Sequence, residues 1–117
     1  MAAPTPAGSW DRLTATQREA VLAEDPVLAV VAAAGSGKTG VLTARVVRRC
    51  QDGTAAASRS LVCTFSRKAA DELRLRLWRL GVGGVRAGTI HRLALRVVAE
   101  WCDHRSDPAP AVLGDRR

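Results

Sequence analysis

One stretch decides the fold that this sequence encodes: Val27-Leu28-Ala29-Val30-Val31-Ala32-Ala33-Ala34-Gly35-Ser36-Gly37-Lys38-Thr39. Residues 27–33 are apolar and partly β-branched, which predicts a buried strand, and the small residues after them predict a loop. Lys38 and Thr39 open an amphipathic segment that predicts a helix. Strand, glycine loop, Lys-Thr and helix, in this order, are typical of a loop that binds nucleotide phosphates.

The chemistry of phosphate binding explains each part of this pattern. Glycines let several backbone N–H groups converge on a phosphate, and the positive end of the following helix adds to the field there. The Lys38 ammonium would reach the β- and γ-phosphates of ATP, and the Thr39 hydroxyl would hold Mg²⁺. The predicted nucleotide-binding residues are Ala32, Ala33, Ala34, Gly35, Ser36, Gly37, Lys38, Thr39 and Gly40, with Lys38 and Thr39 as the catalytic pair.

The pattern is a relaxed one, because Ala32 occupies a first position that is usually glycine. The alternative interpretation is an alanine- and glycine-rich turn followed by an ordinary surface lysine. The predicted strand before the loop and the predicted helix after it favour the phosphate site.

The charge of the chain favours an anionic partner. The 117 residues carry a formal net charge of +7, and the cations concentrate between residues 67 and 96. Such a balance favours nucleic acid, although arginines also make good solvated helix faces.

Length and composition limit the other classes. The chain is long enough for one domain. No apolar run approaches about 18 residues, so no membrane span is expected. Cys50, Cys63 and Cys102 are widely spaced, which supports neither a zinc site nor a disulfide framework. This cysteine usage fits a reducing cytoplasm. We expect the three cysteines to be buried as small hydrophobic residues.

The remaining patterns predict alternating helices and strands. Thr14 and Gln17 have the spacing of a capping box at the start of a first helix, and Gly81 would end a later one. Further strands are expected at 60–65 and 85–87, and further helices at 39–49, 67–80 and 90–101. Three strand–helix units predict an α/β fold with a parallel sheet flanked by helices. Ligand contacts should gather at the carboxyl ends of the strands, where the glycine loop, residues 64–66 and residues 88–91 follow.

Four segments in order resemble the superfamily 1A DNA helicases, the group of UvrD, Rep and PcrA. Residues 13–21 resemble their Q motif, residues 34–39 motif I, residues 64–73 motif Ia and residues 88–95 motif Ib. Two positions depart from the family pattern. Gly40 stands where members commonly carry an arginine that packs on adenine, and Ile90 replaces an aromatic residue of motif Ib.

The resemblance implies a partial RecA-like P-loop NTPase domain that binds ATP with Mg²⁺ and single-stranded DNA. Gln17 would hydrogen-bond the adenine edge, and Phe65 would offer a ring on which a base stacks. The DNA-binding residues it implies are Thr64, Phe65, Ser66, Arg67, Thr89, His91 and Arg92. By family, the enzyme would be an ATP-dependent DNA helicase that moves 3′ to 5′.

The expected layout is a flexible leader at 1–12, the ATP-binding domain at 13–102 and a linker or tail at 103–117. No acidic strand end and no second lobe follow, so we expect this segment to be incomplete and inactive alone. The missing lobes, or a partner subunit, would then complete it. Two other hypotheses stay open at this point: a small P-loop kinase, and a non-catalytic nucleic-acid-binding module that uses the basic helices.

Overall fold

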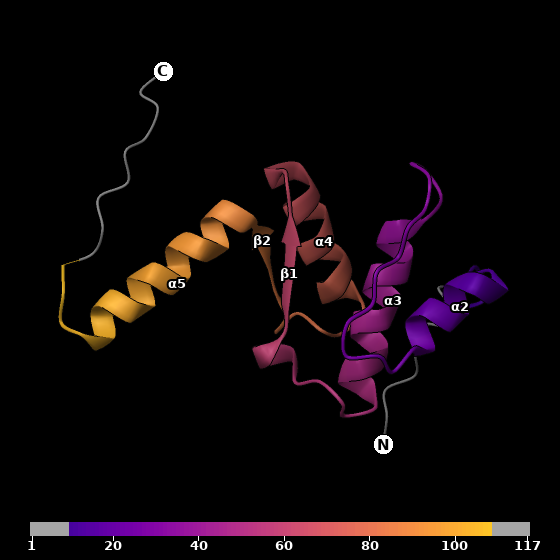
Figure 1. The fold of residues 1–117 in the computed structure, drawn as a ribbon, viewed down its shortest axis with the longest axis horizontal. Coiled ribbons are helices and arrows are strands. Elements are labelled where there is room, and N and C mark those ends of the chain that lie inside the picture. The colour runs from indigo at the N-terminus through magenta and orange to yellow at the C-terminus, as the bar shows by residue number, and fades with distance from the viewer. Residues whose placement is uncertain (1–9, 109–117) are drawn as a thin grey trace.

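The structure, a computed structural model, describes residues 10–108, and within them it is α/β as predicted. The elements are α2 (Ala15–Leu22), α3 (Lys38–Gln51), the short 3-10 helix η1 (Ala57–Arg59), β1 (Leu61–Thr64), α4 (Arg67–Arg79), β2 (Arg86–Thr89) and α5 (Ile90–His104) (Figure 1). Residues 1–9 of the predicted leader and 109–117 of the predicted tail lie outside the described part.

The sheet of the described residues has two strands. β1 pairs with β2 in parallel, in a register that runs from Leu61 opposite Arg86 to Thr64 opposite Thr89. Helix α4 connects the two strands, as a parallel pair requires. The prediction of a parallel α/β arrangement is therefore confirmed for these two strands.

The predicted strand at 27–33 is not formed. This segment belongs to no strand, and its side chains are exposed, with Val27 at 88% and Val31 at 95%. Apolar, β-branched residues make a strand only when a neighbouring strand pairs their backbone groups, and β1 and β2 pair only with each other in the described residues. The prediction of a buried strand here is therefore wrong for the described structure.

Hydroxyl side chains start three of the helices. Thr14, Ser66 and Thr89 are the N-caps of α2, α4 and α5, and each accepts a hydrogen bond from a backbone N–H of the first turn. At Thr14 the predicted capping box is complete, because Gln17 Oε1 accepts from the Thr14 N–H at 2.9 Å. Helix α4 ends before Gly81, as predicted.

The core lies between α3, β1, α4 and the turn before β2. It consists of Val47, Val62, Leu73, Leu77, Val82 and Val85. On β1 only Val62 is buried, while Leu61 and Cys63 are exposed. The expectation that the cysteines are buried is thus wrong for Cys63, because alternate residues of this strand face away from the core.

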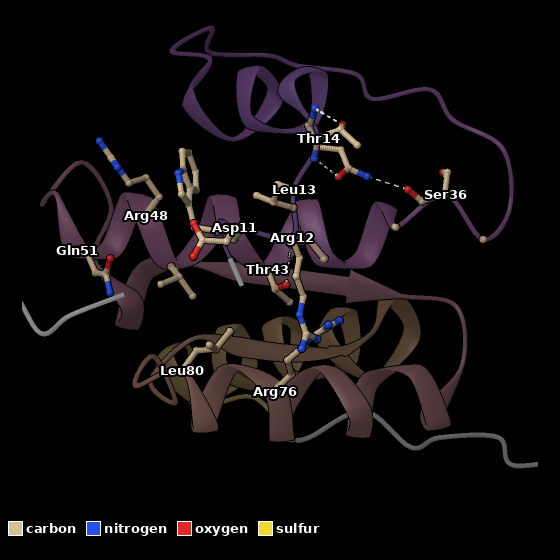
Figure 2. A pocket seen from close by; sticks show the side chains of 17 residues that line it. Asp11, Arg12, Leu13, Thr14, Ser36, Thr43, Arg48, Gln51, Arg76 and Leu80 are labelled. Atoms are coloured by element: carbon tan, nitrogen blue, oxygen red, sulfur yellow. Dashed lines mark hydrogen bonds between the residues drawn. The ribbon is translucent and has the colours of Figure 1, made fainter. Parts of the chain in front are cut away.

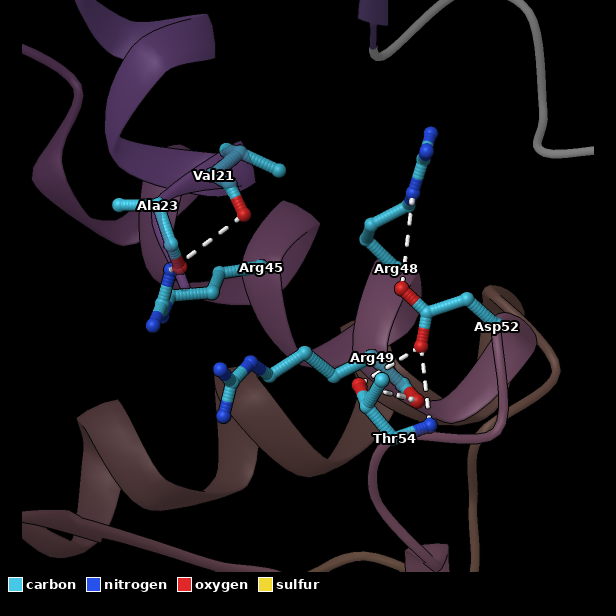
Figure 3. A network of polar contacts seen from close by, with 7 residues as sticks. All are labelled: Val21, Ala23, Arg45, Arg48, Arg49, Asp52 and Thr54. Atoms are coloured by element: carbon cyan, nitrogen blue, oxygen red, sulfur yellow. Dashed lines mark hydrogen bonds and ion pairs between the residues drawn. The ribbon is translucent and has the colours of Figure 1, made fainter. Parts of the chain in front are cut away.

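Arg45 joins α3 to the end of α2. Its Nη1 donates to the carbonyl oxygens of Ala23 at 2.6 Å and Val21 at 3.4 Å (Figure 3). It also donates to the carbonyl oxygen of Ala20 at 2.9 Å. These carbonyls lie at the carboxyl end of α2, where a cation also suits the helix dipole. One half-buried arginine therefore fixes α2 against the helix that follows the glycine loop.

A second polar cluster lies at the carboxyl end of α3. It predicts that the stability of the fold depends on pH. The Thr54 hydroxyl and backbone N–H both donate to the Asp52 carboxylate, at 2.7 and 3.0 Å, and lower the pKa of that carboxyl (Figure 3). Arg48 and Arg49 act in the same direction. Because the folded pKa is the lower one, Asp52 stabilises the fold above its unfolded pKa, and this contribution is lost as pH falls through the folded value.

We therefore expect an NMR titration to place the midpoint of the Asp52 carboxyl below that of an ordinary aspartate. Thr54→Val removes the hydroxyl donor and should raise the midpoint. An unchanged midpoint in that variant would show that the hydrogen bond does not set the pKa.

No helix within residues 10–108 has both the length and the apolar character that crossing a membrane requires.

Candidate functional site: the glycine loop and the strand ends

The glycine loop turns sharply before α3. Gly35 and Gly37 have φ of 78° and 87°, in the left-handed region that favours glycine. The Ser36 hydroxyl and N–H both donate to the Ala33 carbonyl, at 2.6 and 3.2 Å, which closes the turn. Gly37 is the N-cap of α3 and provides no side-chain cap, so the first N–H groups of this helix are left for another acceptor.

Lys38 folds back across this loop. Its Nζ donates to the Ala32 carbonyl at 2.8 Å, so the ammonium lies over the turn that the glycines make. Residues 32–39 are exposed, and Lys38 and Thr39 are the first two residues of α3. The loop thus presents a cation, a hydroxyl and free backbone donors on one accessible surface, which is the donor set that phosphate binding requires.

Gln17 has two structural contacts. Its Oε1 completes the capping box of α2, and its Nε2 donates to the Ser36 carbonyl in the loop at 2.9 Å (Figure 2). A β-carbon at Gly37 would lie 3.1 Å from Nε2, so the glycine also makes room for the amide. One N–H of the amide and one acceptor position of its oxygen remain for a ligand.

These contacts predict that two substitutions of Gln17 behave differently. Gln17→Ala removes both bonds and should destabilise the fold by about 0.5–1.5 kcal/mol for each, measured by urea unfolding. Gln17→Glu keeps the acceptor for Thr14 but loses the donor to Ser36 and adds a negative charge beside the loop. We expect the glutamate variant to keep its helix and to bind nucleotide more weakly.

Thr16→Ala, on the exposed side of the same helix, is the matched control and should change neither property. Equal nucleotide affinity for the glutamate variant and the wild type would show that the contact between Gln17 and Ser36 is not important for the loop.

A pocket of about 700 Å³ begins at the glycine loop and extends along α3 to the end of α4 (Figure 2). Gln17, Ser36 and Gly40 line the end near the loop, and Arg48 and Gln51 line the far end. Since nothing lies within 4 Å of a β-carbon built at Gly40, the missing arginine leaves open space on this wall.

Residues that the sequence predictions did not include also line this pocket: Trp10, Asp11, Arg12, Arg48 and Arg76. They come from three separate parts of the chain, and no local motif marks them. Residues 10–12, which were expected to be a flexible leader, form one wall of the pocket.

A second group of predicted residues meets at the carboxyl ends of the strands. Thr64 and Thr89 are partners in the sheet register, so the segments that follow the two strands start from adjacent positions at one edge of the sheet. The Phe65 side chain is 97% exposed, although its position after a strand would equally suit a core residue. Ser66 and Thr89 serve as helix N-caps here, and the side chains of Arg67, His91 and Arg92 are exposed.

The glycine loop and the strand ends lie at one end of the molecule. In Figure 1 the amino end of α3 and the carboxyl end of β1 both point to the top of the view. The expectation that the glycine loop follows a strand of the same sheet is not met, since residues 27–33 are unpaired. Within residues 10–108 no three His, Cys, Asp or Glu side chains group to hold a metal ion.

Comparison with known proteins identifies relatives for nearly the whole chain. The sequence profile of the UvrD/REP helicase N-terminal domain matches residues 13–112. The ATP-dependent DNA helicase UvrD2 of Mycobacterium tuberculosis is 43% identical over 88 residues, which are 68% of this chain and 13% of that protein. DNA helicase II of Escherichia coli is 41% identical over 91 residues, covering 75% and 13%. A probable DNA helicase II homolog of Rickettsia conorii is 36% identical over 93 residues, covering 79% and 14%.

Proposed function

The chain belongs to the UvrD/REP helicase N-terminal domain family, and from this premise we propose that it is the ATP- and single-stranded-DNA-binding segment of an ATP-dependent DNA helicase. In this proposal the described residues are part of a RecA-like NTPase domain. The chain spans about an eighth of the length of the curated relatives it matches.

The glycine loop is the observation that carries the nucleotide half of the proposal. The phosphates of ATP would accept from the free N–H groups at the start of α3, and Lys38 would leave the Ala32 carbonyl to bind the β- and γ-phosphates. The Thr39 hydroxyl would be one Mg²⁺ ligand. Bound Mg²⁺ supplies charge that neutralises the phosphate oxygens.

The pocket beside the loop is where we place the adenine. Gln17 lines its near end and keeps an unused donor and an unused acceptor, the pair that an adenine edge requires. Gly40 has no side chain on which the adenine can stack. In this chain the apolar contacts with adenine would therefore come from other residues that line the pocket, among them Trp10 and Leu13.

DNA would run across the paired strand ends. A fully exposed phenylalanine is a natural stacking surface for a base, and the backbone would lie over Thr64, Ser66, Arg67, Thr89, His91 and Arg92. The exposure of Phe65 supports this assignment, because a residue that only filled the core would be buried.

Phosphoryl transfer depends on positioning of water and stabilisation of charge, which in this family involves carboxylates and a second lobe beyond the residues described. We therefore infer that this chain binds both ligands and does not hydrolyse ATP by itself. In this proposal turnover, translocation and the 3′ to 5′ direction belong to the whole helicase, with lobes of the same protein or of a partner. The cytoplasm remains the predicted setting.

Two titrations test the proposal. Calorimetry with a slowly hydrolysed ATP analogue and Mg²⁺ should show binding, and the fluorescence anisotropy of a labelled oligothymidylate should rise with protein. Phe65→Ala should weaken DNA binding by about 1–3 kcal/mol and leave nucleotide binding unchanged. Leu61→Ala, an exposed apolar residue at the other end of β1, is the control. Binding of neither ligand by the folded wild type would overturn the proposal.

A further inference from the structure

A second hollow lies along β2, away from the glycine loop and adjoining the strand ends at Arg92. It is a groove of about 840 Å³ between α4, the turn before β2, β2 itself and the outer part of α5. Three consecutive residues of β2, 86–88, line it. Since alternate side chains of a strand point to opposite faces, such a run indicates that the groove follows the strand's edge, and this edge is unpaired in the described sheet.

Every charged residue that lines this groove is an arginine. They are Arg74 from α4, Arg86 from β2, and Arg92 and Arg96 from α5. We call this hollow the arginine groove. Cations from three elements that converge on one hollow concentrate a positive potential there, which attracts an anionic ligand.

The arginines are only partly neutralised. Arg74 pairs with Asp71, and Arg86 and Arg96 share the single carboxylate of Glu100, at 3.5 and 3.6 Å. Among the described residues no carboxylate forms an ion pair with Arg92. The paired arginine side chains are 42–60% exposed, so these ion pairs are weak and the guanidinium groups can turn to an incoming phosphate.

An aromatic residue lines the same groove as the arginines. Trp78 is 70% exposed and lines the groove, and its ring packs on Gly83, where a β-carbon would lie 3.0 Å from Cδ1. The glycine thus lets the indole lie against the backbone of the turn. Single-stranded nucleic acids bind to surfaces that combine these two groups. Their bases stack on an exposed indole, and their phosphates pair with guanidinium groups.

We propose that the arginine groove binds a second stretch of single-stranded DNA, with phosphates on Arg74, Arg86 and Arg96 and a base on Trp78. The inference rests on the proposed function only because both take single-stranded DNA as the ligand. Arg92 lines the groove and is also one of the predicted DNA-binding residues at the paired strand ends, a surface that we call the DNA edge. The groove and the DNA edge are therefore continuous. The indole favours a nucleic acid over an acidic peptide, which would need only the charges.

The double variant Arg74→Ala with Arg96→Ala tests this on the full chain. Its matched control is Arg79→Ala with Arg105→Ala, two exposed arginines of the same helical regions that lie outside the groove. A long oligothymidylate, about 16 nucleotides, is titrated at several salt concentrations. Loss of two phosphate contacts should reduce the steepness of log affinity against log salt by about 1.4 in the groove variant and not in the control.

The length of the oligonucleotide separates this proposal from the proposed DNA binding at the strand ends. An oligothymidylate of about four nucleotides, a size that one binding surface can hold, should depend on Phe65 and not on the groove arginines. If Phe65→Ala weakens both oligonucleotides while the groove variant matches its control, the groove proposal fails and the DNA edge stands. If Phe65→Ala has no effect but the groove variant does, the DNA edge fails instead.

Trp78 gives an independent readout. In a variant with Trp10→Phe and Trp101→Phe, Trp78 is the only tryptophan of the three, and stacking should quench its fluorescence when the long oligonucleotide binds. Trp78→Ala should weaken that binding roughly five- to hundredfold, and Trp78→Phe should restore part of it. Unquenched fluorescence on addition of the long oligonucleotide would overturn the proposal. A change of Trp78 fluorescence with polyglutamate, and none with the oligonucleotide, would also overturn it and would assign the groove to an acidic protein segment.

Discussion

Replacing Lys38 with alanine is expected to weaken binding of the ATP analogue roughly 10- to 100-fold. A hydrogen bond to a charged group is worth about 1.5–3 kcal/mol, and the ammonium would make such bonds with two phosphates. In the described structure Nζ bonds only a loop carbonyl, and the residue is exposed, so the fold should not need it. Calorimetry measures the change in affinity.

Lys68 provides the control for this experiment, because it is the chain's other lysine and lies exposed in the first turn of α4. Lys68→Ala removes the same charge away from the glycine loop and should leave nucleotide affinity within about twofold. Equal weakening by the two variants would show that nucleotide responds to net charge and not to the loop.

Replacing Leu77 with alanine is expected to remove a large part of the stability of the fold. Leu77 is 1% exposed and lies in the core between α3, β1 and α4. Substitutions of this kind cost about 2–5 kcal/mol, against a total of about 5–15 kcal/mol for a typical domain. The buried cluster of the described residues has only six members, so little core remains to compensate. Urea unfolding followed by circular dichroism gives the loss.

Leu75→Ala tests whether the loss depends on burial. Leu75 lies on the same helix but is 48% exposed, so its truncation should change the free energy of unfolding by about 0.5 kcal/mol or less. Similar losses at the two positions would place the core elsewhere than between these elements.

Local signals in the sequence predicted much of this architecture. The capping box at Thr14, the hydroxyl at Ser66 and the glycine at 81 mark helix ends through contacts within a few residues, and the helices begin or end there. Leu73 and Leu77 are four residues apart, which places them on one face of α4, and both are buried. Such features depend on neighbours along the chain, so the sequence alone displays them.

Features that depend on distant partners were not predictable in this way. The apolar run at 27–33 predicts a strand, yet strand formation requires a paired neighbour, which the described residues do not provide. The pocket beside the loop combines residues 10–17 with the ends of α3 and α4, and the arginine groove combines α4, β2 and α5. Arginines are frequent throughout this sequence, so their convergence becomes visible only in three dimensions.

Backbone amide NMR with ATP and Mg²⁺ tests the central claim most directly. If the glycine loop holds the phosphates, the N–H signals of Gly35, Gly37, Lys38 and Thr39 should shift most, and inorganic tripolyphosphate should shift the same signals. The side-chain amide of Gln17 should shift with ATP and much less with tripolyphosphate. Shifts confined to the basic helices α4 and α5, with an unchanged loop, would contradict the account.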